Sequence, residues 1–352
     1  VLNSLLCLFL FVLSVTITAR FTGSAFPSND MRFFDRKLAQ LQEADPPYDV
    51  IFTGSSRVYR HIRPALFDSV AAAHGISTHS YNFGYTGTTP LETPHQLRQI
   101  LEHDRGGHVK WVFVSLEGLE TQLEKMNLRS DRMARYHDVH TFARHARLLF
   151  ANENLTMRER LESLADRVPP LFIHYTGYGR GGTWFRERVD GRSYGIAETW
   201  YRHEDGFLSL DSAVVYAEGV ARDRLERRRD KLARLLDQNG PPATPDRDLA
   251  YQQPVLEDLV ADISAVVRAH GAEAVFFART MDADAAHDLE SARDDGFITH
   301  FISLDDADRY PELHDMRYQF DEGHFGAEGA AYFTRYLAEG FLPIAKAGGA
   351  AP

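Results

Sequence analysis

Two short segments at opposite ends of the chain contain the residue types of a nucleophilic catalyst. Ser56 lies in a Thr-Gly-Ser-Ser-Arg stretch directly after an apolar run, and Asp321 and His324 lie three residues apart before a final amphipathic stretch. An aspartate can fix the tautomer of a histidine, which leaves the other ring nitrogen to take a proton from a serine. These types predict that Ser56 attacks a carbonyl, with His324 as its general base and Asp321 as the orienting group.

Each segment alone also fits a purely structural role. A Gly-Ser-Ser turn commonly caps the helix that follows it, and Asp-x-x-His can be an N-capping aspartate beside an exposed histidine. The catalytic hypothesis therefore depends on the two segments meeting in space.

A third segment could supply donors for an oxyanion. It reads Asn82-Phe-Gly84-Tyr-Thr-Gly87 and ends at Pro90. Gly87 could bring a backbone N–H close to the substrate, or it could simply permit a positive φ in a turn, and both interpretations stay open. The backbone N–H of Ser56, at the start of a helix, is a second candidate. Arg57 is a third, although a surface ion pair would explain it equally well.

The surrounding elements alternate between strand and helix. Apolar runs at 48–53, 79–84, 109–116, 272–277 and 297–302 predict strands, and helical spacing predicts helices at 62–74, 90–103 and 255–270. Nearly continuous apolar strands alternating with helices indicate a parallel sheet covered on both faces. A serine beyond the carboxyl end of a strand would face the crevice where such sheets bind ligands.

Together, the three segments resemble the SGNH/GDSL hydrolase superfamily over roughly 45–118 and 255–342. Gly54-Ser55-Ser56 corresponds to the Gly-Asp-Ser block of that family, Gly87 to its oxyanion-hole glycine, and Asp321 and His324 to its terminal Asp-x-x-His block. The resemblance implies an α/β fold: a three-layer α/β/α sandwich with a mostly parallel, flavodoxin-like sheet. It also implies a Ser56–His324–Asp321 triad and no cofactor or metal.

Two positions depart from the family pattern. Leu119 falls about where the family has an oxyanion-hole asparagine, and Ser55 replaces the aspartate of Gly-Asp-Ser. Loss of one oxyanion donor typically costs about a hundred- to a thousand-fold in rate. Both departures are similar to divergent, membrane-anchored SGNH-like proteins of alginate acetylation and teichoic-acid D-alanylation.

This resemblance predicts ester hydrolysis or O-acyl (acetyl) transfer on an extracytoplasmic, periplasmic glycan, with a membrane-bound acyltransferase as a candidate partner. An esterase for small or lipid esters is an alternative within catalysis. A non-catalytic glycan-binding or assembly protein that keeps the fold is an alternative from another class.

The termini and the middle of the chain are predicted to lie outside the sheet. Residues 1–20 are apolar and predict a single-pass transmembrane anchor, or a signal segment cleaved near Gly23-Ser24-Ala25 that would leave the protein secreted. A connector at 21–44 would lead to a catalytic domain at 45–343. That domain would hold a mainly helical insertion at about 120–250, and a disordered tail at 344–352 would follow it.

The insertion has its own local signals. Thr156 and Glu159 predict a capping box that opens a helix ending at Pro169-Pro170, and a charged helix is predicted at about 212–238. Its basic run, 222–234, is interleaved with acids and indicates a solvated face. An aromatic group could be a carbohydrate platform or the core of the insertion; it comprises Tyr175, Tyr178, Trp184, Phe185, Trp200 and Tyr201.

Composition excludes several other classes of function. The net charge of -11 argues against a nucleic-acid partner, which would need a basic face. The single cysteine, Cys7, lies in the apolar N-terminal run and leaves no thiol elsewhere for catalysis or for a thiolate metal site. His137, His140 and His145 have no further ligand at a recognised spacing, so we expect surface histidines.

Overall fold

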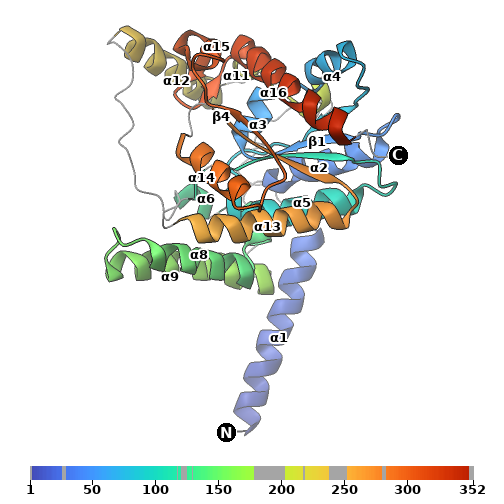
Figure 1. Cartoon of the computed structure of the whole chain (residues 1–352). Coiled ribbons are helices and arrows are strands. Elements are labelled where there is room, and N and C mark those ends of the chain that lie inside the picture. Colours follow the sequence, from blue (N-terminus) through green and yellow to red (C-terminus); the bar gives the residue numbers. More distant parts are fainter. Residues whose placement is uncertain are drawn as a thin grey trace. The chain divides into compact units, whose positions relative to one another are not determined.

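The computed structural model describes residues 2–25, 29–116, 118–119, 125–128, 130–177, 203–216, 219–237, 252–279 and 283–348. Its contacts divide the chain into two compact units (Figure 1). The first comprises 1–36 and 120–196, and the second comprises 37–119 and 197–352. Ser56, Asp321 and His324 all belong to the second unit.

The first unit is helical throughout its described residues. Its helices are α1 (Leu2–Ala25), α6 (Lys125–Leu128), α7 (Asp131–Tyr136), α8 (Val139–Ala151) and α9 (Met157–Thr176). A further helix, α2 (Asn29–Glu43), begins in the first unit and ends in the second. The predicted connector at 21–44 is thus largely helical.

Helix α1 contains the predicted membrane segment. Many of its apolar side chains between Leu5 and Phe21 are exposed, and Leu5, Phe9 and Phe11 are each more than half exposed. Within the part of the chain that the structure describes, no helix combines the length and the apolar character needed to cross a membrane. The transmembrane part of the fold prediction is therefore not found here.

Helix α9 corrects one predicted boundary. The Thr156–Glu159 capping box is present, since the Thr156 backbone N–H donates to the Glu159 carboxylate at 2.8 Å. The helix, however, continues through Pro169 and Pro170 to Thr176. Successive prolines each remove one backbone donor, so they weaken a helix without always ending it.

The first unit also corrects the histidine prediction. His137 and His145 are fully buried, and only His140 of the three is exposed. His137 is the C-cap of α7, whereas His140 and His145 lie on α8, so the three histidines do not share one helix. Burial lowers the pKa of His145 to about 2, with the nearby positive charges of Arg167 and His137 adding to the effect. This imidazole is therefore neutral at physiological pH.

The second unit is built around a five-stranded sheet. In chain order its elements are β1 (Val50–Thr53), α3 (Ser56–His61), α4 (Pro64–Ala73), β2 (Ser80–Asn82), η1 (Pro90–Glu92), α5 (Thr93–His103), β3 (Trp111–Ser115), η2 (His203–Gly206), α11 (Leu210–Tyr216), α12 (Gly219–Asp237), α13 (Gln253–Ala269), β4 (Glu273–Arg279), α14 (Ala283–Asp294), β5 (His300–Leu304), α15 (Pro311–His314), η4 (Met316–Tyr318), β6 (Gln319–Asp321), β7 (His324–Phe325) and α16 (Ala327–Gly348).

The sheet is parallel throughout and has the strand order β2-β1-β3-β4-β5. Helices cover both of its faces, with α4 and α16 on one side and α5 and α13 on the other (Figure 1). Alternate residues of each strand therefore enter two apolar layers. On the α16 side, Phe52 pairs with Phe113, and Phe113 packs its ring 5.2 Å from that of Phe341. The α/β prediction is confirmed.

The order of the strands fixes where a ligand can bind. The chain moves from β1 outward to β2 and then returns to β3 on the other side of β1. Connections on the two sides of such a point leave in opposite directions, which opens a crevice at the carboxyl ends of the two central strands. Ser56 follows β1 and Leu116 follows β3, so both segments lie at this crevice.

Several predicted boundaries differ from the observed ones. The helix predicted at 62–74 begins two residues later, at Pro64, because Ile62 has extended backbone angles and ends the separate helix α3. The predicted disordered tail is helical as far as Gly348, and residues 349–352 lie outside the described part. In the stretch predicted as one helix at 212–238, the structure describes α11 as far as Tyr216 and α12 from Gly219 to Asp237, and residues 217–218 lie outside the described part.

Candidate active site

Ser56 is held at the crevice by a tight turn between β1 and α3. Gly54 has a φ of 154°, and a Cβ there would lie 2.5 Å from Val58 Cγ2 and 3.2 Å from the Ser115 carbonyl oxygen, so only glycine fits. Ser55 is the N-cap of α3, and its Oγ accepts a hydrogen bond from the Arg57 backbone N–H at 3.2 Å. The turn therefore makes Ser56 the first residue of the helix, beyond the end of the buried strand.

Asp321 and His324 occupy the two strands of a small antiparallel hairpin. They are register partners across the turn formed by Glu322 and Gly323. The Gly323 backbone N–H donates to Asp321 Oδ1 at 2.8 Å, which fixes the turn. The sequence predicts the spacing of the pair, but it suggests a loop at a helix entry rather than a hairpin.

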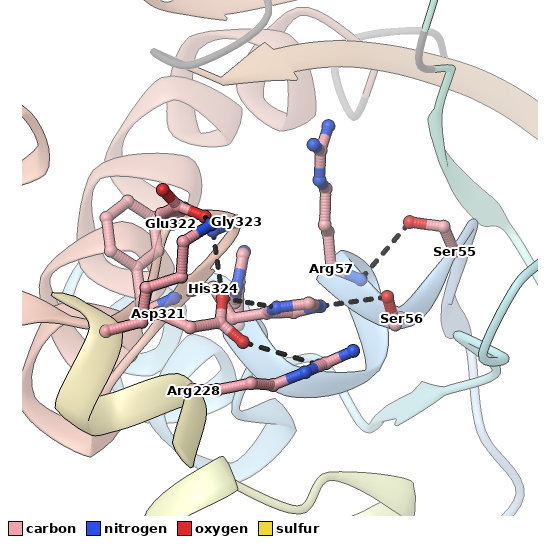
Figure 2. A network of polar contacts seen from close by, with 11 residues as sticks. Ser55, Ser56, Arg57, Arg228, Asp321, Glu322, Gly323 and His324 are labelled. Atoms are coloured by element: carbon pink, nitrogen blue, oxygen red, sulfur yellow. Dashed lines mark hydrogen bonds and ion pairs between the residues drawn. The ribbon is translucent and has the colours of Figure 1, made fainter. Parts of the chain in front are cut away.

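The structure brings the three predicted residues together (Figure 2). Ser56 Oγ lies 3.0 Å from His324 Nε2, and His324 Nδ1 lies 2.8 Å from Asp321 Oδ1. Because a carboxylate can only accept, the proton of the neutral imidazole is on Nδ1, and Nε2 is free to accept the Ser56 hydroxyl proton. This is the geometry that a serine nucleophile and its base require.

No protein-family model matches this chain, and no curated protein sequence matches it. The evidence on the site therefore comes from its geometry and from the sequence resemblance.

The environment of Asp321 favours its charged form. Burial by itself raises the pKa of this carboxyl, but the hydrogen bond from His324, the Gly323 N–H and the positive charge of Arg228 together bring its pKa below the ordinary value. Asp321 is therefore ionised at neutral pH. An ionised carboxylate beside Nδ1 stabilises the imidazolium that forms when His324 takes a proton.

Arg228 reaches Asp321 from α12, inside the predicted insertion. Its Nη1 lies 3.5 Å from Asp321 Oδ2, the oxygen opposite the one that contacts His324 (Figure 2). Three residues further along the same helix, Lys231 Nζ lies 2.6 Å from Glu322 Oε2. The basic run at 222–234 was predicted as a solvated face. Its described side chains are mostly exposed, but two of them attach α12 to the catalytic hairpin.

Asn82 fixes the far end of the short helix α3. Its fully buried Nδ2 donates to the carbonyl oxygens of Val58 and Ile62, each at 2.8 Å, while its Oδ1 accepts the Gly84 N–H at 2.8 Å. The Val58 carbonyl also accepts the Ile62 backbone N–H, whereas the Ile62 carbonyl lies just beyond α3, so Asn82 adds hydrogen bonds where the helix ends. Asn82 thereby ties the segment that carries Gly87 to the helix that carries Ser56.

Lys37 holds the same segment from the opposite side. Its buried Nζ donates to the carbonyl oxygens of Asn82, Gly84 and Gly206 at 2.7, 3.0 and 3.1 Å, and lies 4.5 Å from the centre of the Tyr59 ring. Burial, with a smaller effect of Arg60, lowers the pKa of Lys37 well below its usual value. Three acceptors occupy all three donors of an ammonium group, so Lys37 acts on the backbone rather than on a substrate.

The remaining oxyanion candidates differ in what surrounds them. Gly87 has a φ of 74° in the turn after β2, a backbone conformation that favours glycine, so the turn alone explains the glycine at this position. The backbone N–H of Arg57 is already bound by Ser55. Figure 2 shows the Arg57 side chain extending away from the contact between Ser56 and His324.

Leu119 lies at the position of the missing asparagine and is turned into the core. Its side chain is buried, and its backbone N–H donates to Gln252 Oε1 at 3.0 Å. Neither group is available to an oxyanion at Ser56. Within the described residues, no cluster of three or more histidine, cysteine, aspartate or glutamate side chains is arranged to hold a metal ion. Of the proposed aromatic platform, only Tyr175 lies inside the described part of the chain, about half exposed on α9.

Sequence reasoning missed Lys37, His61 and Arg228, and it gave Asn82 no role of its own. Asn82 is the one that a pattern could reveal, since it opens the Asn-x-Gly block. Lys37 and Arg228 lie in charged helical stretches that look like solvated faces. Their contacts are made across 45 and 93 residues of sequence, so local spacing contains no sign of them.

Proposed function

We propose that the chain is a serine esterase or O-acyltransferase of the SGNH type. The observation that carries this proposal is the 3.0 Å contact between Ser56 Oγ and His324 Nε2, with Asp321 on the other ring nitrogen. The strand order β2-β1-β3-β4-β5 supports the flavodoxin-like version of the three-layer fold. The position of Ser56 after β1, and of the Asp-x-x-His hairpin before the last helix, supports the same assignment.

The proposed reaction begins with attack of Ser56 Oγ on an ester carbonyl while His324 Nε2 takes the hydroxyl proton. The negative oxygen of the tetrahedral intermediate faces the backbone N–H groups of Ser56 and Gly87. When the bond to the leaving alcohol breaks, the alcohol takes the proton from His324 and the acyl group stays on Ser56. A second hydroxyl, from water or a sugar, then gives its proton to His324 and attacks the acyl carbon. When the bond to Ser56 breaks, the serine oxygen takes this proton back from His324, and both residues return to their starting state.

The substrate we propose is an acylated extracytoplasmic glycan, with a membrane-bound acyltransferase as the source or recipient of the acyl group. The departures at Ser55 and Leu119 from the usual hydrolase blocks support this choice over a general small-ester esterase. Incubation with an activated acetyl ester and oligosaccharide would test it. Acetyl found on sugar hydroxyls indicates transfer, whereas acetate alone indicates hydrolysis.

We also propose that α1 attaches the protein to a membrane from the extracytoplasmic side. The support is its set of exposed apolar side chains between Leu5 and Phe21, since such a surface is unfavourable in water. Alkaline carbonate extraction of membranes would test this. Full-length protein is expected in the membrane pellet and a chain lacking residues 1–25 in the supernatant; full-length protein in the supernatant would exclude attachment.

One observation favours a second candidate, a non-catalytic glycan-binding protein. The position of the third-block asparagine is occupied by Leu119, whose side chain and N–H are both engaged in the core. Such a protein would keep the fold and bind the glycan without forming an acyl-enzyme.

A serine-directed fluorophosphonate probe separates the two candidates. The wild-type chain is expected to become labelled on Ser56, and Ser56→Ala is expected to abolish labelling. Ser55→Ala is the matched control, because it removes a neighbouring hydroxyl that caps α3 without removing the nucleophile. Absence of labelling in the folded wild-type chain, or labelling that survives in Ser56→Ala, would overturn the catalytic proposal.

A further inference from the structure

A second histidine lies behind the catalytic one. His61 is the last residue of α3, five positions after Ser56, and only 1% of it is exposed. Its ring packs 4.8 Å from the ring of Phe325 and 5.9 Å from that of Phe333, and it meets the ring of His324 edge-on at 5.8 Å. His61 is thus enclosed between the nucleophile's helix, the catalytic hairpin and α16.

A hydrogen bond of the His61 side chain connects two of these elements. Its Nε2 accepts a hydrogen bond from the Phe325 backbone N–H at 3.0 Å. A ring nitrogen that accepts from an N–H carries no proton, so this geometry assigns the neutral tautomer with its proton on Nδ1. Phe325 directly follows His324, and the contact therefore joins the residue after the general base to the helix that begins with the nucleophile.

The backbone of His61 is fixed by a second contact. Thr334 Oγ1, on α16, lies 3.0 Å from the His61 carbonyl oxygen and accepts the Arg63 N–H at 3.0 Å. The imidazole consequently cannot shift along α3 without losing these bonds. Ser56 and His324 are therefore linked through His61. The short helix α3 joins Ser56 to His61, and the hydrogen bond from the Phe325 N–H joins His61 to the residue after His324.

We propose that His61 is a positioning residue, which sets the separation between Ser56 Oγ and His324 Nε2 by accepting the Phe325 N–H. This inference rests on the proposed function for its kinetic consequence, but its geometric content stands separately. A displacement of about 1 Å between reacting groups can cost about a hundred-fold in rate. Without the acceptor, the buried Phe325 N–H would also lose this partner. The resulting free-energy cost favours a displacement of β7.

Two amide variants provide a matched test. In His61→Gln, the side-chain oxygen is the same number of bonds from Cβ as Nε2, so it can accept from Phe325. In His61→Asn, the oxygen corresponds to Nδ1 and falls short of that N–H. The two variants have the same chemistry and differ only in reach. A third, His61→Leu, keeps bulk and removes the acceptor.

The measurement is the rate of fluorophosphonate labelling at Ser56, together with kcat and KM on an activated ester. We expect His61→Gln to label close to the wild-type rate, and His61→Asn and His61→Leu about a hundred-fold more slowly with little change in KM. Equal labelling by the Asn and wild-type chains, or equally slow labelling by the Gln and Asn chains, would overturn the inference. Should the Leu chain fail to fold, the Gln and Asn pair still decides.

A structural readout keeps this test separate from the proposed function. Crystal structures of the Gln and Asn variants report the distance from Ser56 Oγ to His324 Nε2 whether or not the wild-type chain is an enzyme. The inference expects this distance to be kept in the Gln variant and lengthened in the Asn variant. An unchanged distance in the Asn variant contradicts it, whereas a wild-type chain that never becomes labelled contradicts only the proposed function.

Discussion

The imidazole of His324 lies 3.0 Å from the hydroxyl of Ser56, although 268 residues separate the two along the chain. Ser56 follows a central strand, β1, and His324 lies on the hairpin of β6 and β7, which precedes the last helix. Helix α3 meets this hairpin through His61 and Phe325. The contact between Ser56 and His324 therefore depends on the fold of the second unit as a whole.

Replacing Asp321 with asparagine should reduce kcat by about 10⁴-fold, because an amide can hold the imidazole in the wrong tautomer and cannot stabilise its charged form. Hydrolysis of an activated acetyl ester measures the effect. Glu322→Gln removes a charge from the adjacent residue, whose partner is Lys231, and should stay near the wild-type rate. A fall of less than ten-fold in Asp321→Asn would argue against its role.

Arg228→Gln should raise the pKa of Asp321 towards its ordinary value, since Arg228 is one of the groups that lower it. A lowered carboxyl pKa contributes stability above the ordinary pKa, and this contribution is lost as pH falls through the folded-state value. The variant should therefore lose stability at neutral pH but not at strongly acid pH. Because Arg228 is 43% exposed, we expect a loss below about 1 kcal/mol.

Urea unfolding at the two pH values, with a carboxyl-carbon NMR titration of Asp321, measures this effect of Arg228. Arg222→Gln is the control, because it removes the same charge from the same helix while its partner is Glu226. An identical pKa of Asp321 in the two variants would show that the contact with Arg228 does not lower that pKa.

Asn82→Ala should lower the free energy of unfolding by about 3 kcal/mol. It removes the Asn82 partner of the Ile62 carbonyl and of the buried Gly84 N–H, and it leaves the Val58 carbonyl with only the Ile62 N–H. Ser80→Ala removes one small hydroxyl, which donates to the Pro64 carbonyl at 3.2 Å and also contacts the Asp68 carboxylate, and it should cost about 1–2 kcal/mol. Chemical denaturation measures both. Equal losses of unfolding free energy in the two variants would mean that the hydrogen bonds of Asn82 do not stabilise the fold more than those of Ser80.

Leu119→Asn tests whether the family's oxyanion donor can be restored. We expect no gain in activity and a loss of about 1–3 kcal/mol in stability. The amide would replace a buried side chain beside Leu256 and Leu289, and Gln252, which also lines this site, already accepts the backbone N–H of residue 119. Activity on an activated ester and thermal unfolding check the two parts. A hundred-fold gain in kcat would instead show that the segment after β3 can turn towards Ser56.

Much of the second unit could be predicted from the sequence. Buried parallel strands give long apolar runs, so β1, β3, β4 and β5 have clear signals, and the residue types at 56, 321 and 324 point to one chemistry. The hairpin of β6 and β7 is too short for any periodicity, and only the Asp-x-x-His spacing marks it. The continuation of α9 through two prolines was unpredictable for another reason, since tertiary packing overrode a local preference.

The supporting residues could not be predicted in the same way. A buried lysine and a buried histidine have the same letters as their solvated counterparts, and burial is decided by segments far away in the chain. Lys37 was assigned to a connector, and His61 to the stretch before a helix. Both are identified by what they touch: three carbonyl oxygens in one case, a single N–H in the other.

The placement of Asp321 and His324 on facing strands of one hairpin has a consequence for how the protein would fail. Asp321 and His324 form a local unit whose internal geometry needs only four consecutive residues, so mild perturbation should leave the contact between them intact. The hydroxyl of Ser56 belongs to a different part of the fold, and the gap between the two parts is bridged by packing beneath α16. Partial unfolding of α16 would then separate Ser56 from His324 and abolish the proposed reaction. The central sheet would remain folded and would still unfold cooperatively.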